Sequence, residues 1–447
     1  MRSKRHSFFG LLLILTAAVA VRADKVDDYL KAEMLKQHIP GVSLAVVKDG
    51  KIIKAEGYGL ANLELNVPAR PETVFKIGSV SKQFISAGIL LLIQEGKISL
   101  DDSISKFLEG TPETWKPITV RHLLTHTSGI VREAPGFDPL KIQSDADVIK
   151  TAYSLPLRFA PGEKWEYCNV GYFSLAEIIR KVSGKPWGEY LSDALFKPLE
   201  MNSTRTTTMT DLVQDRANGY GWREGKYSNA AIYLALRPSG AFLSNVLDLA
   251  KWDAALYTER VLKQPSREQM WTAVKLNGGT TYPYGFGWEL DSVGGHRQIH
   301  HGGSLPGFRA ELSRFVDDKL TVIVLTNSDN ANPGTIALGV AEFYIPNLIR
   351  TRTAVKINPA ILDAYVGQYQ AEPTAVLTVT REGDKLMAQQ GSSSEKWEWL
   401  PESEVNFFAK GGNRRQTFSF VKDERGQVTH LVVLIEGREI GRAMKIK

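Results

Sequence analysis

Two β-hairpin patterns, far apart in the sequence, constrain the fold of this chain more than any other feature. The first covers residues 41–57, where two runs rich in valine and isoleucine flank an Asp-Gly turn, and the second covers residues 310–325. Paired β-rich runs around a short turn are typical of antiparallel hairpins. The segments between them, such as residues 79–94 and 173–182, have helical patterns instead. This order predicts an α+β fold, in which an antiparallel sheet built from both ends of one domain is flanked by helices and has a helical subdomain beside it.

A second domain is predicted at the C-terminus. A chain of 447 residues is long for a single domain. From residue 354 the pattern changes to short alternating runs separated by glycine-containing turns, which is typical of a small all-β, barrel-like domain. We therefore expect a principal domain over residues 24–353 and an all-β domain over residues 354–447.

The first 23 residues have the pattern of a secretory signal peptide. Three basic residues precede an apolar run over residues 8–21, and Ala23 fits the small-residue rule before a cleavage site. The apolar run is short for a membrane span, which needs about 20 residues, and an uncleaved anchor is the alternative. We expect an exported protein, periplasmic or secreted, whose mature chain starts near Asp24 and keeps no stable membrane span.

The charge of the chain argues against a nucleic-acid partner. Its formal net charge of +6 includes four basic residues and no acidic one in the predicted signal peptide, so the mature chain carries only +2. The chain contains no lysine- and arginine-rich stripe with interleaved aromatic residues. Its single cysteine, Cys168, excludes an internal disulfide, so packing must stabilise the fold.

Ser79 and Lys82 form an S-x-x-K motif, a pattern that recurs from Ser103, Ser393 and Ser419. Only the copy at Ser79 opens a long apolar helical run. The unpaired N–H groups and the dipole at a helix start stabilise developing negative charge, and the i+3 spacing puts Lys82 on the same helix face. A buried lysine can lose its proton near neutral pH and then accept the proton of the serine hydroxyl. We expect Ser79 to be a nucleophile with Lys82 as its partner, the alternative being a helix N-cap followed by a solvated lysine.

Tyr167 and Asn169 form a Tyr-x-Asn motif that supplies the second element. A phenol near a lysine ammonium can have a lowered pKa and can relay protons, and an asparagine can orient the lysine or a substrate carbonyl. The same spacing occurs at residues 227–229. A Pro-Gly turn at residues 161–162 and a helical pattern directly after the motif favour Tyr167 over that competitor. The alternative is a core tyrosine followed by a turn asparagine.

A glycine-rich segment, residues 299–308, supplies the third element before the second hairpin. Its candidate residues are His300, His301, Gly302, Gly303 and Ser304. Small residues on an edge strand let a substrate backbone approach closely. The N–H of Ser304, with that of Ser79, would form an oxyanion hole, in which each donor typically contributes about 3 kcal/mol in the transition state. The histidines lack the spacing of a metal site, so we expect neither a metal nor a cofactor.

With these three elements in order, the chain resembles the serine β-lactamase and penicillin-binding protein-like superfamily over residues 27–350. It is most similar to the class C-like branch, which contains class C β-lactamases, family VIII esterases, D-aminopeptidases and DD-carboxypeptidases. The stretches that carry the likeness are residues 75–84, 118–129, 161–169, 239–244 and 248–252. The resemblance implies a site in the cleft between the sheet and the helical part. The C-terminal domain resembles the lipocalin-like appendages of some exported members.

The resemblance also implies individual roles in the first two motifs. Ser79 would be the acylated nucleophile, and Lys82 its base or proton relay. Tyr167 would be a second base, acting on the deacylating water or the leaving group, and Asn169 would support the substrate and the lysine. Cys168 stands where the family motif usually has serine.

In the third motif, His301 with Gly302 and Gly303 occupies the place where β-lactamases of this class carry Lys-Thr-Gly or a similar sequence. His300 also fits the H-x-G spacing. With His301 in first place, however, the residues after Gly303 match those that come after the family motif. A lysine there would hold a β-lactam carboxylate, whereas a histidine is only partly charged at pH 7.

This departure sets the expected substrates. We expect a serine hydrolase that acts through an acyl-enzyme on small esters, amides or D-amino-acid peptides, with weak β-lactam hydrolysis. One alternative is a dedicated class C-like β-lactamase. Another is a penicillin-binding or sensing module that is acylated and barely deacylates.

Overall fold

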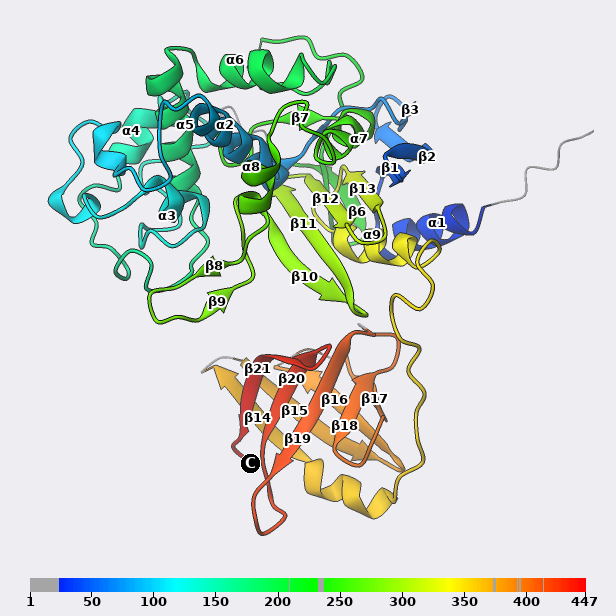
Figure 1. The fold of residues 1–447 in the computed structure, drawn as a ribbon. Helices are drawn as coiled ribbons and strands as arrows, with labels where there is room; N and C mark the ends of the chain where they lie inside the picture. The colour runs from blue at the N-terminus through cyan, green and yellow to red at the C-terminus, as the bar shows by residue number, and fades with distance from the viewer. Residues whose placement is uncertain are drawn as a thin grey trace, which may run out of the picture.

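The computed structural model describes residues 24–208, 210–231, 237–372, 375–391, 393, 395–412 and 414–447. These residues form a mixed α and β domain and a C-terminal barrel, joined in Figure 1 by one segment of chain. The α+β architecture and the all-β C-terminal fold predicted from the sequence are confirmed. The predicted signal peptide, residues 1–23, lies outside the described residues. Within the described part of the chain, no helix has the length and apolar character needed to cross a membrane.

A seven-stranded antiparallel sheet joins the two ends of the first domain, with the order β10-β11-β12-β13-β1-β2-β3. β1 pairs with β13 from Val42 opposite Thr326 to Lys48 opposite Leu320, so the two predicted hairpins lie side by side. The strands of the sheet are β1 (Gly41–Lys48), β2 (Lys51–Asn62), β3 (Val67–Pro68), β10 (Glu289–Val293), β11 (His296–Leu305), β12 (Phe308–Phe315) and β13 (Leu320–Thr326).

The alternating side chains of β1 divide the core between the two faces of the sheet. Val42, Leu44 and Val46 belong to a cluster with the helices α1 (Lys25–Gln37) and α9 (Pro333–Ala341). Ala45 and Val47 belong to the larger cluster that includes the helical subdomain. A sheet covered on both faces needs apolar residues at successive positions, because consecutive side chains point to opposite sides.

The helical subdomain is built around α2 (Lys82–Gln94) and α5 (Asn169–Ser183). α2 is almost entirely buried, as its continuous apolar sequence predicts. α5 begins earlier than the sequence pattern indicates, because Cys168 Sγ accepts a hydrogen bond from the N–H of Gly171 and caps the helix. The other elements of this domain are β4 (Phe75–Lys76), η1 (Gly78–Ser81), η2 (Ile104–Lys106), η3 (Glu113–Trp115), α3 (Val120–Leu124), α4 (Asp145–Lys150), α6 (Trp187–Leu191), η4 (Ser192–Phe196), β5 (Tyr220–Arg223), β6 (Lys226–Asn229), β7 (Leu243–Ser244), α7 (Val246–Ala255), α8 (Gln264–Met270), β8 (Val274–Lys275) and β9 (Thr281–Tyr282).

The C-terminal strands close into a barrel in which β14 pairs with β21. A separate apolar cluster fills the barrel, so it has its own core. In Figure 1 the barrel lies beneath the end of β10, and the turn η5 (Pro359–Tyr365) lies at its far side. Its strands are β14 (Gly367–Glu372), β15 (Ala375–Glu382), β16 (Lys385–Gln390), β17 (Trp397–Pro401), β18 (Asn406–Ala409), β19 (Gln416–Lys422), β20 (Val428–Ile435) and β21 (Arg438–Lys445).

Candidate active site

Ser79 lies on the 3₁₀ turn η1, between β4 and α2. Gly78, directly before it, has a φ of 53°, in the left-handed region that favours glycine. A Cβ on Gly78 would also come within 2.5 Å of the backbone nitrogen of Ser304. Glycine therefore lets this turn press against β11, while Ser79 itself is only partly buried and lines a cleft.

Lys82 is completely buried at the start of α2. Its Nζ lies 3.1 Å from Ser79 Oγ, 2.9 Å from Asn169 Oδ1 and 2.8 Å from the carbonyl oxygen of Ser239. Burial, followed by the positive charge of Arg237, holds the pKa of Lys82 well below its usual range. A neutral amine has two N–H donors and one lone pair, which match the two carbonyl acceptors and the hydroxyl of Ser79. The geometry therefore suits proton transfer from Ser79 to Lys82.

A charged pair behind Asn169 completes the surroundings of the lysine. Asn169 Nδ2 donates to Glu133 at 2.5 Å, and Arg237 donates to the other oxygen of the same carboxylate at 2.5 Å. This chain of contacts fixes the amide so that its oxygen faces Lys82. Sequence reasoning missed Glu133 and Arg237, because they come from separate loops and share no spacing with the S-x-x-K motif.

The pair also predicts opposite shifts in the pH dependence of activity. Arg237 lowers the pKa of Lys82 and Glu133 raises it. Since only the neutral amine accepts a proton, Arg237→Gln should move the acid limb of the kcat/KM profile to higher pH, and Glu133→Gln should move it to lower pH. Arg158→Gln, which breaks a surface pair with Glu166, is the control and should leave the limb in place. Movement of both limbs in the same direction would contradict a neutral Lys82 base.

Tyr167 is a protonated phenol in this site. Burial raises its pKa above the usual value, although a hydrogen bond with Ser79 opposes that shift. Lys82 Nζ lies 4.7 Å from the centre of the Tyr167 ring, so Ser79, Lys82 and Tyr167 are brought together. The direction of the shift favours Tyr167 as a proton donor in the resting site, rather than the ready base expected from the sequence.

His301 belongs to a buried chain of hydrogen bonds that sequence reasoning did not anticipate. The backbone N–H of Cys168 donates to His126 Nδ1 at 3.1 Å, so the proton of the neutral His126 ring is on Nε2 and faces Tyr284 Oη at 3.2 Å. The Tyr284 hydroxyl then donates to His301 Nε2 at 3.1 Å, and His301 Nδ1–H donates to the Gly302 carbonyl at 2.6 Å. Burial lowers the pKa of His301 to about 3, so this ring is neutral.

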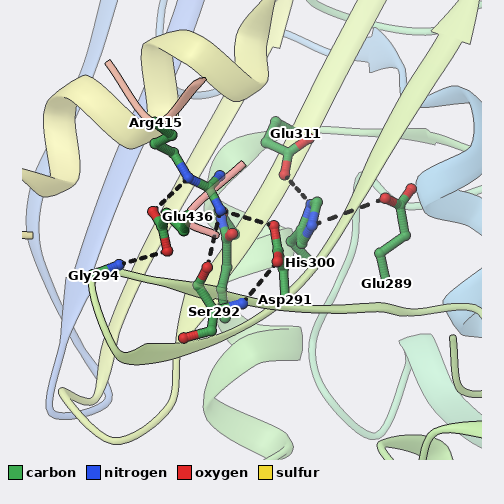
Figure 2. Close-up of polar contacts among 10 residues, drawn as sticks. Glu289, Asp291, Ser292, Gly294, His300, Glu311, Arg415 and Glu436 are labelled. Atoms are coloured by element: carbon green, nitrogen blue, oxygen red, sulfur yellow. Dashed lines mark hydrogen bonds and ion pairs between the residues drawn. The ribbon is translucent and has the colours of Figure 1, made fainter. Parts of the chain in front are cut away.

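His300, the neighbouring histidine, is positively charged, whereas His301 is neutral. Burial alone would lower its pKa, but the Glu311 carboxylate, 3.0 Å from His300 Nδ1, and then Glu289 raise it to about 9. Figure 2 shows His300 between Glu311 and Glu289. The sequence alone did not predict this difference, because partners and burial decide which of the two adjacent rings is charged.

Gly303 and Ser304 lie on β11 directly beside the Ser79 turn. A Cβ on Gly303 would stand 1.9 Å from the carbonyl oxygen of Ile77 and 3.3 Å from the backbone nitrogen of Ser79, so only glycine fits there. The backbones of Ser79 and Ser304 are thereby close together, as two donors to one oxyanion need to be.

Except for Lys82 and His300, which lie behind the surface, the candidate residues border one cleft of about 920 Å³. It lies between the sheet and the helical subdomain, as the resemblance implied. Its lining includes Ser79, Tyr167, Asn169, Ser239, His301, Gly302, Gly303 and Ser304, together with Arg132, Glu133, Arg237, Glu289, Arg309 and Glu311. In the described part of the chain, no group of three or more His, Cys, Asp or Glu side chains is placed to hold a metal ion.

The competing motifs lie elsewhere. Tyr227 is on the hairpin strand β6 and is exposed. Ser103 caps the turn η2, and Ser419 lies on the barrel strand β19. Of the four S-x-x-K motifs, the copy at Ser79 is the one bordering the cleft.

Two family models match the chain. The family described as "Beta-lactamase" matches residues 26–343, and "Domain of unknown function (DUF3471)" matches residues 351–445. The chain therefore belongs to the beta-lactamase family and is a serine hydrolase of that fold. Penicillin-binding protein 4* of Bacillus subtilis (strain 168) is 30% identical to it over 417 residues, which cover 87% of this chain and 92% of the relative. Protein flp of Staphylococcus aureus (strain MW2) is 26% identical over 377 residues, or 79% of this chain and 72% of the relative.

Solved structures share this fold. The octameric penicillin-binding protein homologue from Pyrococcus abyssi has a TM-score of 0.66 and 28% identity, covering 94% of this chain and 99% of the homologue. The D-amino acid amidase from Ochrobactrum anthropi SV3 has a TM-score of 0.61 and 24% identity, covering 71% of this chain and 96% of the amidase. The first likeness extends through the barrel, whereas the second covers less of the chain and shows the fold alone.

Proposed function

We propose that the chain hydrolyses small esters and amides, including D-amino-acid peptides, through an acyl-enzyme on Ser79. The observation that carries this function is the position of Ser79 Oγ beside a buried Lys82 amine whose other two contacts are carbonyl acceptors. Such an amine can take the hydroxyl proton without first losing one to water. The catalytic unit is assigned to residues 24–353 and the barrel unit to residues 354–447.

In the acylation step, Ser79 Oγ attacks the substrate carbonyl carbon while its proton moves to Lys82 Nζ. The carbonyl oxygen becomes an oxyanion that accepts hydrogen bonds from the backbone N–H groups of Ser79 and Ser304. As the bond to the leaving group breaks, the leaving oxygen or nitrogen takes a proton from Tyr167 or Lys82. The product is a Ser79 ester.

In the deacylation step, water attacks that ester. If Lys82 protonated the leaving group, the water proton goes to Lys82. If Tyr167 did so, the water proton goes to the Tyr167 oxygen. Ser79 Oγ leaves and takes a proton from the Lys82 ammonium. The neutral pair of Lys82 and Tyr167 is restored, so the cycle balances without a cofactor. Because Lys82 and Tyr167 provide a base near the ester, the site supports an enzyme that turns over rather than a binding module that stays acylated.

The neutral charge of His301 supports esters and amides over β-lactams. A β-lactam carboxylate gains most from a fixed cation at the third motif, and loss of one charge-assisted hydrogen bond costs about 1.5–3 kcal/mol, or roughly 10- to 150-fold. We therefore expect kcat/KM for nitrocefin to be at least about tenfold below that for p-nitrophenyl butyrate or D-alanyl-p-nitroanilide. One panel with these three substrates tests this order. Fastest turnover of nitrocefin would instead identify a β-lactamase, and a penicillin adduct that lasts hours by intact mass would identify a non-turnover binding protein.

Export is part of the proposed function. It is supported by the signal-peptide pattern of residues 1–23, and N-terminal sequencing of the exported protein should begin at or near Asp24. Retention of Met1 in the exported protein would contradict cleavage.

A further inference from the structure

The barrel contacts the first domain at the turn that joins β10 to β11, and Figure 2 shows this contact. Arg415, just before β19, donates from Nη2 to Asp291 Oδ2 at 3.1 Å and to the Ser292 carbonyl at 2.9 Å. Its Nε donates to Glu436 at 2.8 Å, and the second oxygen of Glu436 accepts from the N–H of Gly294 at 3.0 Å. Two barrel residues therefore hold the end of β10 and the first residue of this turn.

β10 needs support from outside the sheet because it is an edge strand. It is hydrogen-bonded only to β11 within the seven-stranded sheet. On its outer side, the start of β10 pairs briefly with residues 283–284, where the Leu290 N–H donates to the Pro283 carbonyl, whereas no such partner is seen in the described structure for residues 291–293, the part of the edge that Arg415 contacts. The Arg415 contacts, at a side chain only 12% exposed, are therefore placed to limit movement of β10.

The held strand also forms part of the cleft wall. Glu289 and Asp291 are two positions apart on β10, so their side chains share a face, and Glu289 lies opposite His300 in the β10–β11 register. His300 in turn contacts Glu311 on β12. Positive and negative side chains thus alternate between the barrel and the cleft. Arg415 is followed by Asp291, then by His300, and then by Glu289 and Glu311, which line the cleft with Ser79.

We propose that Arg415 is a positioning residue through which the C-terminal barrel holds the β10 wall of the substrate cleft. Ser79 and Lys82 lie on η1 and α2 and are fixed by contacts that do not involve β10. The barrel therefore acts on binding of substrates long enough to reach Glu289 and leaves the chemical step unchanged. This inference rests on the proposed hydrolase activity, which is its readout. Labelling of Ser79 by a small fluorophosphonate separates failure of the proposed function from failure of the inference about Arg415. Failed labelling in the unmodified protein would count against the proposed function only.

The test is Arg415→Met in the full chain, with Arg442→Met as the matched control. Arg442 pairs with Glu439 on its own strand. For a D-aminoacyl dipeptide p-nitroanilide, Arg415→Met should raise KM by about 3- to 30-fold with kcat nearly unchanged. Turnover of p-nitrophenyl acetate and the rate of fluorophosphonate labelling should stay at the unmodified level. Hydrogen exchange of the amides of residues 289–293 should become faster, and the control should change none of these.

A second variant keeps the test decisive if Arg415→Met folds poorly. Asp291→Asn weakens the same contact from the other side and should raise KM in the same way. The double variant should raise KM no more than the larger single effect, because both changes break one interaction. An unchanged KM in Arg415→Met and Asp291→Asn would overturn the inference. So would an equal loss of kcat on the long and the short substrate, which indicates general damage to the fold.

Discussion

Ser79→Ala is expected to lower kcat/KM by about 10⁴- to 10⁶-fold for every ester and amide substrate. The change removes the only atom that can form the proposed ester, and the neighbouring Ser81 cannot replace it, because Ser81 is buried and its Oγ accepts from the N–H of Phe242. The measurement is steady-state hydrolysis of p-nitrophenyl butyrate by purified protein.

Ser103→Ala is the matched control for that change. Ser103 has the same S-x-x-K spacing, but it caps η2 and donates to the Lys116 carbonyl. Its loss should leave kcat/KM within about twofold of the unmodified protein, because Ser103 lies outside the cleft and loss of a cap typically costs only about 1 kcal/mol of stability. Retention of more than about one hundredth of the activity in Ser79→Ala would refute Ser79 as the nucleophile, because nucleophile loss typically costs far more.

Lys82→Met is expected to lower kcat/KM by about 10³-fold, as general-base removal typically costs 10²- to 10⁴-fold. Methionine fits a dry pocket of similar length but cannot accept the Ser79 proton. Lys82→Arg should not restore activity, because a guanidinium stays protonated in proteins. Both variants are assayed with the ester used for Ser79→Ala.

Lys106→Met is the control, because Lys106 follows Ser103 by the same spacing but pairs with Asp102 at the surface. Its activity should match that of the unmodified chain. If Lys82→Met kept activity within about tenfold, a range below that expected for loss of a general base, another group would have to accept the serine proton.

Much of the fold follows from the sequence because its signals are local. Two hairpins are identified by the Asp-Gly turn between β1 and β2 and by the apolar runs of β12 and β13. Because the segments between them are mostly helical, the two hairpins are expected to pair with each other in one sheet. The short alternating runs after residue 354 similarly identify the barrel strands. The early start of α5 was not predicted, because it depends on capping by the unusual Cys168.

The site was less predictable, because much of its chemistry comes from residues far apart in the chain. Ser79 and Lys82 could be found from their spacing and helical context. Tyr284 and Glu133 have no such spacing, and only the folded chain places them against His301 and Asn169.

The charge state of the site also had to await the structure. The sequence treats His300 and His301 as equivalent imidazoles, whereas Glu311 keeps the first charged and burial keeps the second neutral. The direction of the Tyr167 shift likewise follows from burial that no motif reveals.

Single-turnover acylation across pH tests most directly whether a neutral Lys82 activates Ser79. The chain would be mixed rapidly with an ester, quenched, and the acylated peptide identified by mass spectrometry at each pH. We expect the acyl group on Ser79, with an acylation rate constant that reaches its plateau well below the ordinary lysine pKa of about 10.4, because burial holds the pKa of Lys82 well below its usual range. An adduct on another residue, or a rate that rises about tenfold per pH unit toward the ordinary lysine pKa of about 10.4, would contradict it.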